Sequence, residues 1–207
     1  MAGKRGKGKK RTGKPRGTEH EVRAQEAPKR SWLVLGLLLV LAVVLAVVWA
    51  LSRRQNEGAY AAVETVKIET NKGNILINVY PEKMPITAGN FLDLVNRGFY
   101  DGLIWHRVED WVVQTGDPTG TGMGGSEKTI KLETHGDLKN VVGAVGMARS
   151  QARDSASSQF YILKQDASWL DGDYAVFGEV IEGMDVVNNL VQGDKMLKVT
   201  VVPKSSE

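Results

Sequence analysis

The chain contains no cysteine among its 207 residues. Disulfide bonds, thiolate catalysis and lipid attachment through cysteine are therefore excluded. Histidine is also scarce: the only three are His20, His106 and His135, and no two of them lie at the spacing of a zinc site. We therefore expect no metal ion and no other cofactor, and a structural role for His106.

Two segments superficially suggest other chemistry but lack its essential residues. Ser155–Ser158 contains serines without the Gly-x-Ser-x-Gly elbow that exposes a hydrolase nucleophile. Gly120–Gly125 is rich in glycine, but the Lys-Ser/Thr pair that completes a phosphate-binding loop does not follow it. We expect the glycine-rich segment to be a surface loop.

Acidic and apolar residues are both rare at the N-terminus. Residues 1–30 hold eleven lysines and arginines against three glutamates, a net charge of +8, whereas the whole chain carries +3. Such a segment has too little to bury, so we expect a basic disordered tail. The tail has no aromatic residue for base stacking, which argues against specific nucleic-acid binding. Contact with anionic lipid is the simpler expectation.

Charge is absent from Trp32 to Leu51, a run of twenty residues. A helix of that length spans about 30 Å, the thickness of the hydrocarbon core of a bilayer. We therefore expect a transmembrane signal anchor over residues 31–52, with residues 32–51 in contact with the lipid bilayer. Positive charge is concentrated before the run, so we expect the N-terminus in the cytoplasm and the C-terminal portion outside it, in a single-pass protein of the cell membrane.

Two other interpretations of the apolar run stay open. A buried globular helix usually keeps polar residues on one face, and this run has none. A cleaved secretory signal has an apolar core of roughly 7–15 residues, which is shorter than this run. Ala59–Ala61 offers a cleavage site that would release a secreted protein.

The remainder divides into a linker at residues 53–63 and a domain at residues 64–203, which is long enough for a substantial core. Helices are predicted at residues 87–97, with Thr87 as the N-cap, and at residues 184–190. Alternating apolar residues and turn signals predict many short strands, which favours a mostly antiparallel β barrel. The predicted strands cover residues 66–70, 75–80, 103–108, 111–114, 130–132, 144–147, 159–162, 176–180 and 198–202.

One of these segments carries the most informative chemistry. Arg107, Trp111 and Gln114 fall within eight residues of a strand-like stretch. If the alternation holds, with a kink at Glu109–Asp110 to adjust its phase, the three side chains lie near one another on one sheet face. A cationic donor, an aromatic wall and an amide suit peptide recognition better than acid–base or metal chemistry.

Six motifs follow one another along the chain: Ile104–Val108, Gln114–Gly122, Gly146–Ser150, Ser158–Ile162, Trp169–Gly172 and Val176–Met184. Taken in this order, they resemble those of the cyclophilin family of peptidyl-prolyl cis/trans isomerases, in particular its shorter bacterial-type members. The resemblance spans about residues 65–202 and leaves out the tail and the apolar run. It implies a closed eight-stranded antiparallel barrel capped by two α-helices.

The resemblance also implies site residues. Arg107 matches the catalytic arginine of the family, and Gln114 matches the glutamine that orients it. Trp111, Val112, Phe160 and Leu170 are then expected to form the pocket for the proline ring. The implied partners are proline-containing polypeptides, with no cofactor. The complete set of matched substrate-binding positions is Trp111, Val112, Ala148, Arg149, Gln159, Phe160, Trp169, Leu170 and Tyr174.

The sequence departs from the family pattern at two points. One residue fewer separates the arginine from the pocket aromatic, and Trp111 stands where the family usually has phenylalanine. We expect both changes to affect substrate range and rate. The implied function is a prolyl isomerase that assists the folding of exported proteins at the membrane. A non-catalytic peptide-binding or chaperone module on the same fold is one alternative. A membrane scaffold whose basic tail recruits a cytoplasmic partner is another.

Overall fold

The computed structural model describes residues 38–48 and 60–203. Residues 38–48 are helical with exposed side chains. They cover the middle of the predicted membrane segment; its ends, the predicted basic tail and most of the predicted linker lie outside the described residues. Among the helices of the two described ranges, none combines the length and the apolar character needed to cross a membrane.

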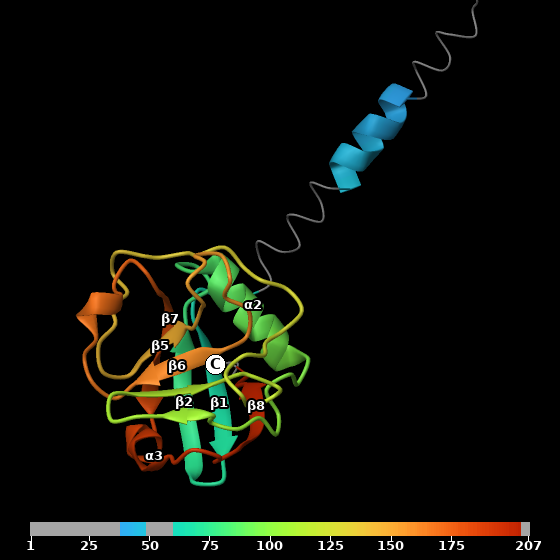
Figure 1. Cartoon of the computed structure of the whole chain (residues 1–207). Coiled ribbons are helices and arrows are strands. Elements are labelled where there is room, and N and C mark those ends of the chain that lie inside the picture. The colour runs from blue at the N-terminus through green and yellow to red at the C-terminus, as the bar shows by residue number, and fades with distance from the viewer. Residues whose placement is uncertain (1–37, 49–59, 204–207) are drawn as a thin grey trace, which may run out of the picture. The chain divides into compact units, whose positions relative to one another are not determined.

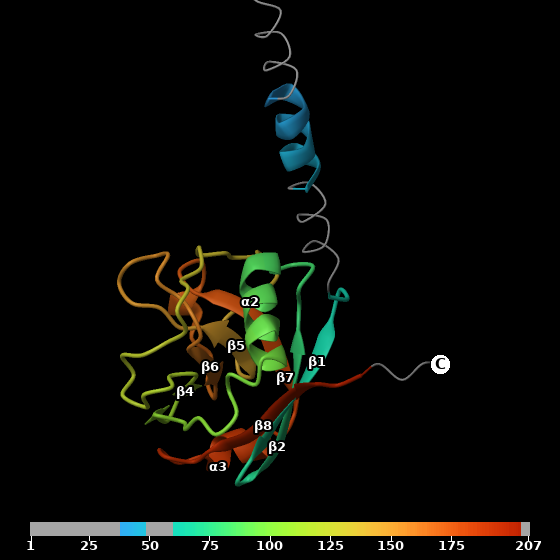
Figure 2. The same ribbon diagram turned by 90° about the vertical axis from the view of Figure 1, so that its right-hand side faces the viewer.

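Residues 60–203 form an eight-stranded antiparallel sheet that curls around an apolar core (Figures 1 and 2). The strand order is β3-β4-β6-β5-β7-β2-β1-β8. The predicted mostly-β fold is therefore confirmed. The strands are β1 (Glu64–Thr70), β2 (Gly73–Val79), β3 (Arg107–Val108), β4 (Val112–Thr115), β5 (Ala144–Met147), β6 (Phe160–Leu163), β7 (Ala175–Glu182) and β8 (Met196–Val201).

The closed barrel that the sequence predicted is corrected to an open, curled half-barrel. Strands β3 and β8 are the two edges, and no strand ladder joins them. A seam of irregular backbone lies between them: Ile104 forms an isolated bridge with Lys195, and the Trp105 N–H donates to the Asp194 carbonyl over 2.8 Å. Four backbone hydrogen bonds in all cross this seam, between residues 102–105 and 193–196, but they do not extend into a ladder between β3 and β8, so the sheet curls without closing.

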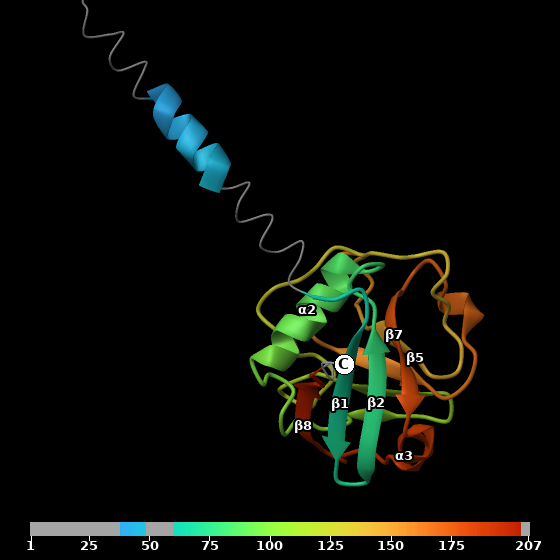
Figure 3. The same cartoon turned by 180° about the vertical axis from the view of Figure 1, so that it is seen from behind.

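The longest ladder is the β1–β2 hairpin, which Figure 3 shows from behind. Alternate residues of both strands are fully buried, including Val66, Ile68, Ile75 and Ile77. This alternation of buried and exposed side chains is the pattern that the sequence displayed, since successive strand residues point to opposite faces.

Helices α2 (Pro85–Asn96) and α3 (Met184–Asn189) lie at opposite ends of the curled sheet (Figures 1–3). The prediction that Thr87 caps α2 is wrong, because the helix begins two residues earlier at Pro85, with Met84 in the capping position. The carboxylate of Glu133 accepts the N–H groups of Ile86 and Thr87 instead. A distant acidic side chain therefore supplies the cap, and local sequence could not reveal it.

Two strand predictions were also wrong. Residues 130–132 contain only an isolated bridge between Ile130 and Ala156, and the strand predicted over residues 103–108 is reduced to Arg107–Val108. A 3₁₀ helix, η1 (Ser168–Leu170), was not predicted. These segments lie in loops that tertiary contacts shape, so apolar periodicity does not describe them.

Aromatic side chains fill the space between α2 and the sheet. The ring of Phe91 on α2 lies 5.3 Å from those of Tyr100 and Phe160 and 5.0 Å from that of Phe177, centroid to centroid. All four residues are completely buried. Truncating such a ring to alanine costs about 3–5 kcal/mol, so this cluster fixes β6 against α2. Residues that neighbour Phe160 in sequence are thereby held in place.

Candidate active site

Strands β3 and β4 form a tight hairpin that brings Arg107 and Gln114 together. The two residues are directly opposite in the ladder, and the Glu109 N–H donates to the Val112 carbonyl over 2.8 Å to close the turn. The Arg107 Nη1 donates to Gln114 Oε1 over 3.1 Å. The predicted proximity is present, but a chain reversal produces it and not a kink within one strand.

The turn residue Glu109 contacts both neighbouring side chains of the cluster. One carboxylate oxygen accepts from Arg107 Nε over 2.7 Å, and the other accepts from Trp111 Nε1 over 2.8 Å. The guanidinium carbon lies 5.4 Å from the centre of the Trp111 ring. The hydrogen bond from Arg107 lowers the pKa of Glu109, and the one from Trp111 acts in the same direction. The sequence indicated Glu109 only as part of a kink.

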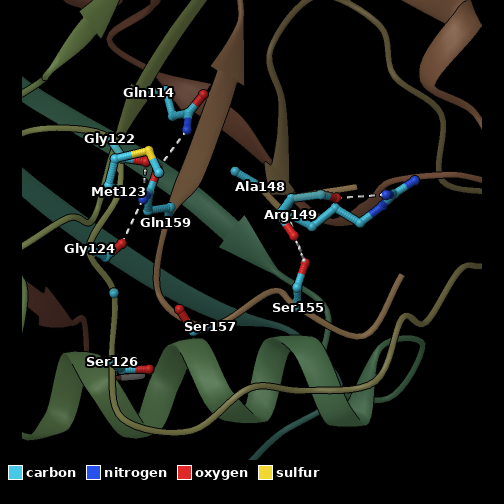
Figure 4. Close-up of a pocket in the computed structure, with 12 residues that line it drawn as sticks. Gln114, Gly122, Met123, Gly124, Ser126, Ala148, Arg149, Ser155, Ser157 and Gln159 are labelled. Carbon is cyan, nitrogen blue, oxygen red and sulfur yellow. Dashed lines mark hydrogen bonds between the residues drawn. The ribbon is translucent and has the colours of Figure 1, made fainter. Parts of the chain in front are cut away.

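A chain of amides continues from Gln114 into the glycine-rich loop. Gln114 Nε2 donates to Gln159 Oε1 over 2.7 Å. Gln159 Nε2 then donates to the carbonyls of Gly122 and Gly124, over 3.0 and 2.6 Å. Gln159 thus joins the β3–β4 hairpin to the loop, as Figure 4 shows.

A cavity of about 210 Å³ opens beside Arg107. It combines a cation and an amide with aromatic and aliphatic walls, which suits a small apolar ring attached to a polar backbone. Eight of the matched site residues line it, together with one that was not predicted. The lining residues are Arg107, Trp111, Val112, Gln114, Ala148, Arg149, Tyr161, Leu170 and Tyr174.

Tyr161 is the residue that sequence reasoning missed. Its ring lies against Gly146, its partner in the β5–β6 ladder, where any side chain at position 146 would overlap it. Its hydroxyl donates to Asn140 Oδ1 over 2.6 Å. Burial raises the pKa of this hydroxyl, so it stays protonated and able to donate. A glycine within the predicted strand 144–147 was the available signal, since it marks a close approach.

The prediction that Phe160 lines the ring pocket is wrong. Its side chain is completely buried and packs edge-on against Phe91, Tyr100 and Trp105 in the core. Adjacent strand residues point to opposite faces, so one of Phe160 and Tyr161 must face the cavity and the other must face α2. In the structure, Tyr161 is the residue that lines the cavity.

Two further matched residues sit at the margin of the cavity. Trp169, in η1, is 66% exposed, and its ring centre lies 5.7 Å from that of Trp111. Arg149 lines the cavity, but its guanidinium is occupied: Nε donates to the Asp173 carbonyl over 2.8 Å, and Cζ lies 4.7 Å from the Tyr174 ring centre. Arg149 therefore braces the rim with its side chain.

A second hollow of about 450 Å³ adjoins the first, and Gln114, Ala148 and Arg149 line both. Figure 4 shows its walls, which come from the glycine-rich loop on one side and from Arg149 and Ser155 on the other. Because they share these three residues, the two hollows form one continuous groove.

Asp117 organises the glycine-rich loop. It is 1% exposed, and its carboxylate accepts the backbone N–H groups of Thr119, Thr121, Gly122 and Gly124 at 2.7–3.1 Å. Burial alone would raise the pKa of this carboxyl, but these hydrogen bonds together hold it well below its ordinary range. The loop that walls the second hollow is therefore built around one buried anion.

His106 lies behind the groove, as the sequence predicted for a structural residue. It is 8% exposed, and neither ring nitrogen has a hydrogen-bond partner among the described residues. Burial lowers the pKa of its imidazole, which favours the neutral form. Neutral His106 fits a packing role between Arg107 and the loop.

Comparison with known proteins agrees with this geometry. Residues 65–205 match the family described as cyclophilin type peptidyl-prolyl cis-trans isomerase/CLD. A peptidyl-prolyl cis-trans isomerase of Helicobacter pylori is 39% identical over 154 residues, covering 72% of this chain and 93% of that protein. Peptidyl-prolyl cis-trans isomerase B of Bacillus subtilis is 43% identical over 129 residues, covering 61% and 90%.

Solved structures show the same fold. A Cryptosporidium parvum cyclophilin type peptidyl-prolyl cis-trans isomerase superposes with a TM-score of 0.65 at 27% identity, covering 69% of this chain and 99% of that one. The crystal structure of that protein in the presence of the dipeptide Ala-Pro superposes with a TM-score of 0.63, also at 27% identity, covering 68% and 99%.

Proposed function

The chain belongs to the cyclophilin-type peptidyl-prolyl cis-trans isomerase family and catalyses rotation about X–Pro peptide bonds; on this premise we propose that Arg107 is its catalytic residue. The observation that carries the proposal is the position of the Arg107 guanidinium, which lines the small cavity beside three aromatic residues and is held there by Gln114 and Glu109. A proline ring in the cavity brings its amide nitrogen to this cation.

The chemistry requires only a well-placed donor. Rotation about a peptide bond is opposed by roughly 18–20 kcal/mol, because nitrogen shares its lone pair with the carbonyl. In the twisted transition state the prolyl nitrogen becomes pyramidal and recovers that lone pair. Arg107 then donates a hydrogen bond that the planar ground state cannot accept, so it stabilises the transition state selectively.

The rest of the cavity holds one side of the bond still while the other turns. Trp111, Val112, Tyr161 and Leu170 enclose the ring with apolar surface, and Ala148 leaves room for the substrate backbone. Gln114 accepts from one Nη1 hydrogen of Arg107 and donates to Gln159. Because the amide of Gln114 is itself fixed, it orients Arg107 and is a positioning residue.

Substrates are proline-containing polypeptides. The relative solved in the presence of Ala-Pro supports this class, and the adjoining hollow lined by Gln159 and Ser155 provides room for the residues that precede proline. Substrate range follows from that hollow and from the large side chain of Trp111.

A proline-isomerisation assay on the purified full-length chain tests the role of Arg107. Arg107→Ala should lower kcat/KM by about 100- to 1000-fold, the effect of losing one transition-state donor. Folding should change little, because the side chain is 40% exposed. Arg97→Ala removes an exposed cation at the end of α2 and is the matched control. Activity of Arg107→Ala within about threefold of the parent would overturn the assignment.

We further propose that the isomerase domain is held at the outer face of the cell membrane. The support is the uncharged run Trp32–Leu51, preceded by a segment of net charge +8. In this arrangement residues 64–203 meet polypeptides as they emerge from export, and slow X–Pro isomerisation limits the folding of such chains. The basic tail meets anionic lipid on the cytoplasmic side.

A further inference from the structure

Glu109 occupies an unusual position in the site. It is the residue through which the shortened β3–β4 turn touches both the cation and the aromatic wall, although its own side chain is not among those lining the cavity. We propose that Glu109 is a positioning residue for isomerisation, which sets Arg107 and Trp111 at a fixed relative orientation. This inference rests on the proposed role of Arg107.

The first support is that two different acceptors bind two different nitrogens of the Arg107 guanidinium. Arg107 gives Nε to Glu109 and one Nη1 hydrogen to Gln114, at 2.7 and 3.1 Å. Within residues 38–48 and 60–203, no group accepts from Nη2. Two anchors on different nitrogens of a planar group define its plane, so the remaining N–H groups are directed without a search among rotamers. The entropy cost of ordering the Arg107 side chain is then incurred on folding and not on reaching the transition state.

The second support is the match between Glu109 and an indole. Trp111 Nε1 donates to Glu109 Oε2 over 2.8 Å. A phenylalanine ring has no N–H and could not make this bond. The two departures from the family pattern, a shorter turn and a tryptophan at position 111, are therefore linked in this structure. The carboxylate supplies an anchor that an indole can use and a phenyl ring cannot.

The third support is the geometry of the turn. Glu109 and Val112 bracket a two-residue turn made by Asp110 and Trp111, with the Glu109 N–H bonded to the Val112 carbonyl. Trp111 therefore lies in the turn itself. The Lys164 N–H donates to its carbonyl over 2.8 Å, which fixes the backbone and leaves the ring to be oriented by side chains. The carboxylate of Glu109 and the ring of Trp169 supply contacts on two sides.

The neighbouring Asp110 provides a control for the negative charge of the turn. It is exposed, lies in the same turn and carries the same charge, but its carboxylate makes no hydrogen bond to any described residue. An effect of Glu109 that came only from the electrostatic field near Arg107 would be reproduced by Asp110→Asn. An effect that came from hydrogen-bond geometry would not.

The experiment measures kcat and KM for X–Pro peptides on the full-length chain and four variants: Glu109→Ala, Trp111→Phe, the double variant, and Asp110→Asn. Glu109→Ala should lower kcat by about threefold to fivefold, with KM less affected. Trp111→Phe should lower kcat by a smaller factor. The double variant should resemble Glu109→Ala, because both changes remove the same contact. Asp110→Asn should match the parent.

A spectroscopic measurement separates positioning from general stability. The indole N–H resonance of Trp111, identified by its loss in Trp111→Phe, should move upfield in Glu109→Gln, because a neutral amide is a weaker acceptor than a carboxylate. The thermal unfolding midpoint of Glu109→Gln should stay close to that of the parent, although its kcat falls. Glu109→Gln should recover part of the kcat lost in Glu109→Ala, since its amide oxygen keeps one of the two bonds.

Three outcomes would overturn the inference. These are a kcat of Glu109→Ala within about 1.5-fold of the parent, an equal loss in Asp110→Asn, or multiplicative losses in the double variant. Any of them, observed while Arg107→Ala is inactive, would remove the role of Glu109 and leave that of Arg107 intact. An active Arg107→Ala would instead remove the premise itself.

Discussion

The ring of Tyr161 fills the space in which a side chain at position 146 would lie, and Gly146 faces it directly across the β5–β6 ladder. The position of the Tyr161 ring, which lines the ring cavity, therefore depends on the lack of a side chain at Gly146 on the neighbouring strand. The hydrogen bond from the Tyr161 hydroxyl to Asn140 fixes the far end of the same ring. Asn140 is in turn anchored to Asp171, which accepts from both its backbone and its side-chain nitrogen.

This relationship predicts the effect of a single methyl group. Gly146→Ala should push the Tyr161 ring into the cavity, lower kcat/KM by about tenfold or more, and cost about 1–3 kcal/mol of unfolding free energy. Peptide kinetics and thermal unfolding measure the two effects. Gly136→Ala is the matched control, since a Cβ there would meet nothing within 4 Å. Unchanged activity in Gly146→Ala would show that the position of Tyr161 does not matter.

The aromatic wall predicts a loss of peptide binding when it is removed. Trp111→Ala should lower kcat/KM by about fivefold to thirtyfold, chiefly through KM, because a large apolar surface no longer contacts the ring. Kinetics on a series of X–Pro peptides would measure this loss. Trp169→Phe keeps an aromatic ring at the neighbouring position and should have a smaller effect. If Trp111→Ala equals the parent on every peptide, Trp111 does not line the proline site.

Asp117 predicts a defined response to acid. Its folded-state pKa is depressed, so its contribution to stability is present above the ordinary aspartate pKa of about 3.9 and is lost as the pH falls below that value. Asp117→Asn places an amide N–H₂ against backbone donors and should cost about 3 kcal/mol at neutral pH. Denaturant unfolding of parent and variant should show a difference that narrows between about pH 4 and pH 2.

The control for this series is Asp110→Asn, whose unfolding free energy at neutral pH should match that of the parent, because its carboxylate makes no hydrogen bond to any described residue. A constant gap between Asp117→Asn and the parent across the acid range would mean that the charge of Asp117 is not what holds the loop. Activity should fall together with loop order in Asp117→Asn, because Gln159 bonds to two carbonyls of the same loop.

The proposed membrane arrangement predicts a protection pattern. With an epitope at each end of the chain, protease added to bacterial spheroplasts should remove the C-terminal epitope and spare the N-terminal one. Lysed spheroplasts, in which both epitopes are accessible, are the control. A mature protein that begins near Ala62 would establish the cleaved-signal alternative instead. Protection of both epitopes would place the isomerase domain on the cytoplasmic side.

Sequence periodicity predicted the hairpin at residues 66–80 because local alternation and burial agree there. The strand at 144–147 was also predicted, although all four of its residues are buried. Periodicity could not choose between Phe160 and Tyr161. All four residues of β6 are buried, so the sequence shows no contrast between its two faces. Only the pairing of Tyr161 with Gly146, set by a distant strand, decides which ring faces the cavity.

The sequence predicted that Arg107, Trp111 and Gln114 lie together, but it did not predict the role of Glu109 or the turn that brings them together. The motif placed Arg107 and Gln114 together, whereas the chain reversal at Glu109–Val112 depends on a turn without glycine or proline, so it lacked the usual signal. The capping of α2 by Glu133 is a similar case. Each involves a long-range or side-chain contact that pattern reading along one segment does not capture.

The seam between β3 and β8 has a consequence for how the sheet can associate with other polypeptide chains. Edge strands normally offer rows of unpaired amides on which another polypeptide can add a strand. Here β3 is only two residues long, and the start of β8 is covered by backbone bonds from Gly102 and to Leu103. An incoming extended chain finds little template to join. The groove can therefore engage extended segments by their proline residues without the sheet itself seeding their aggregation.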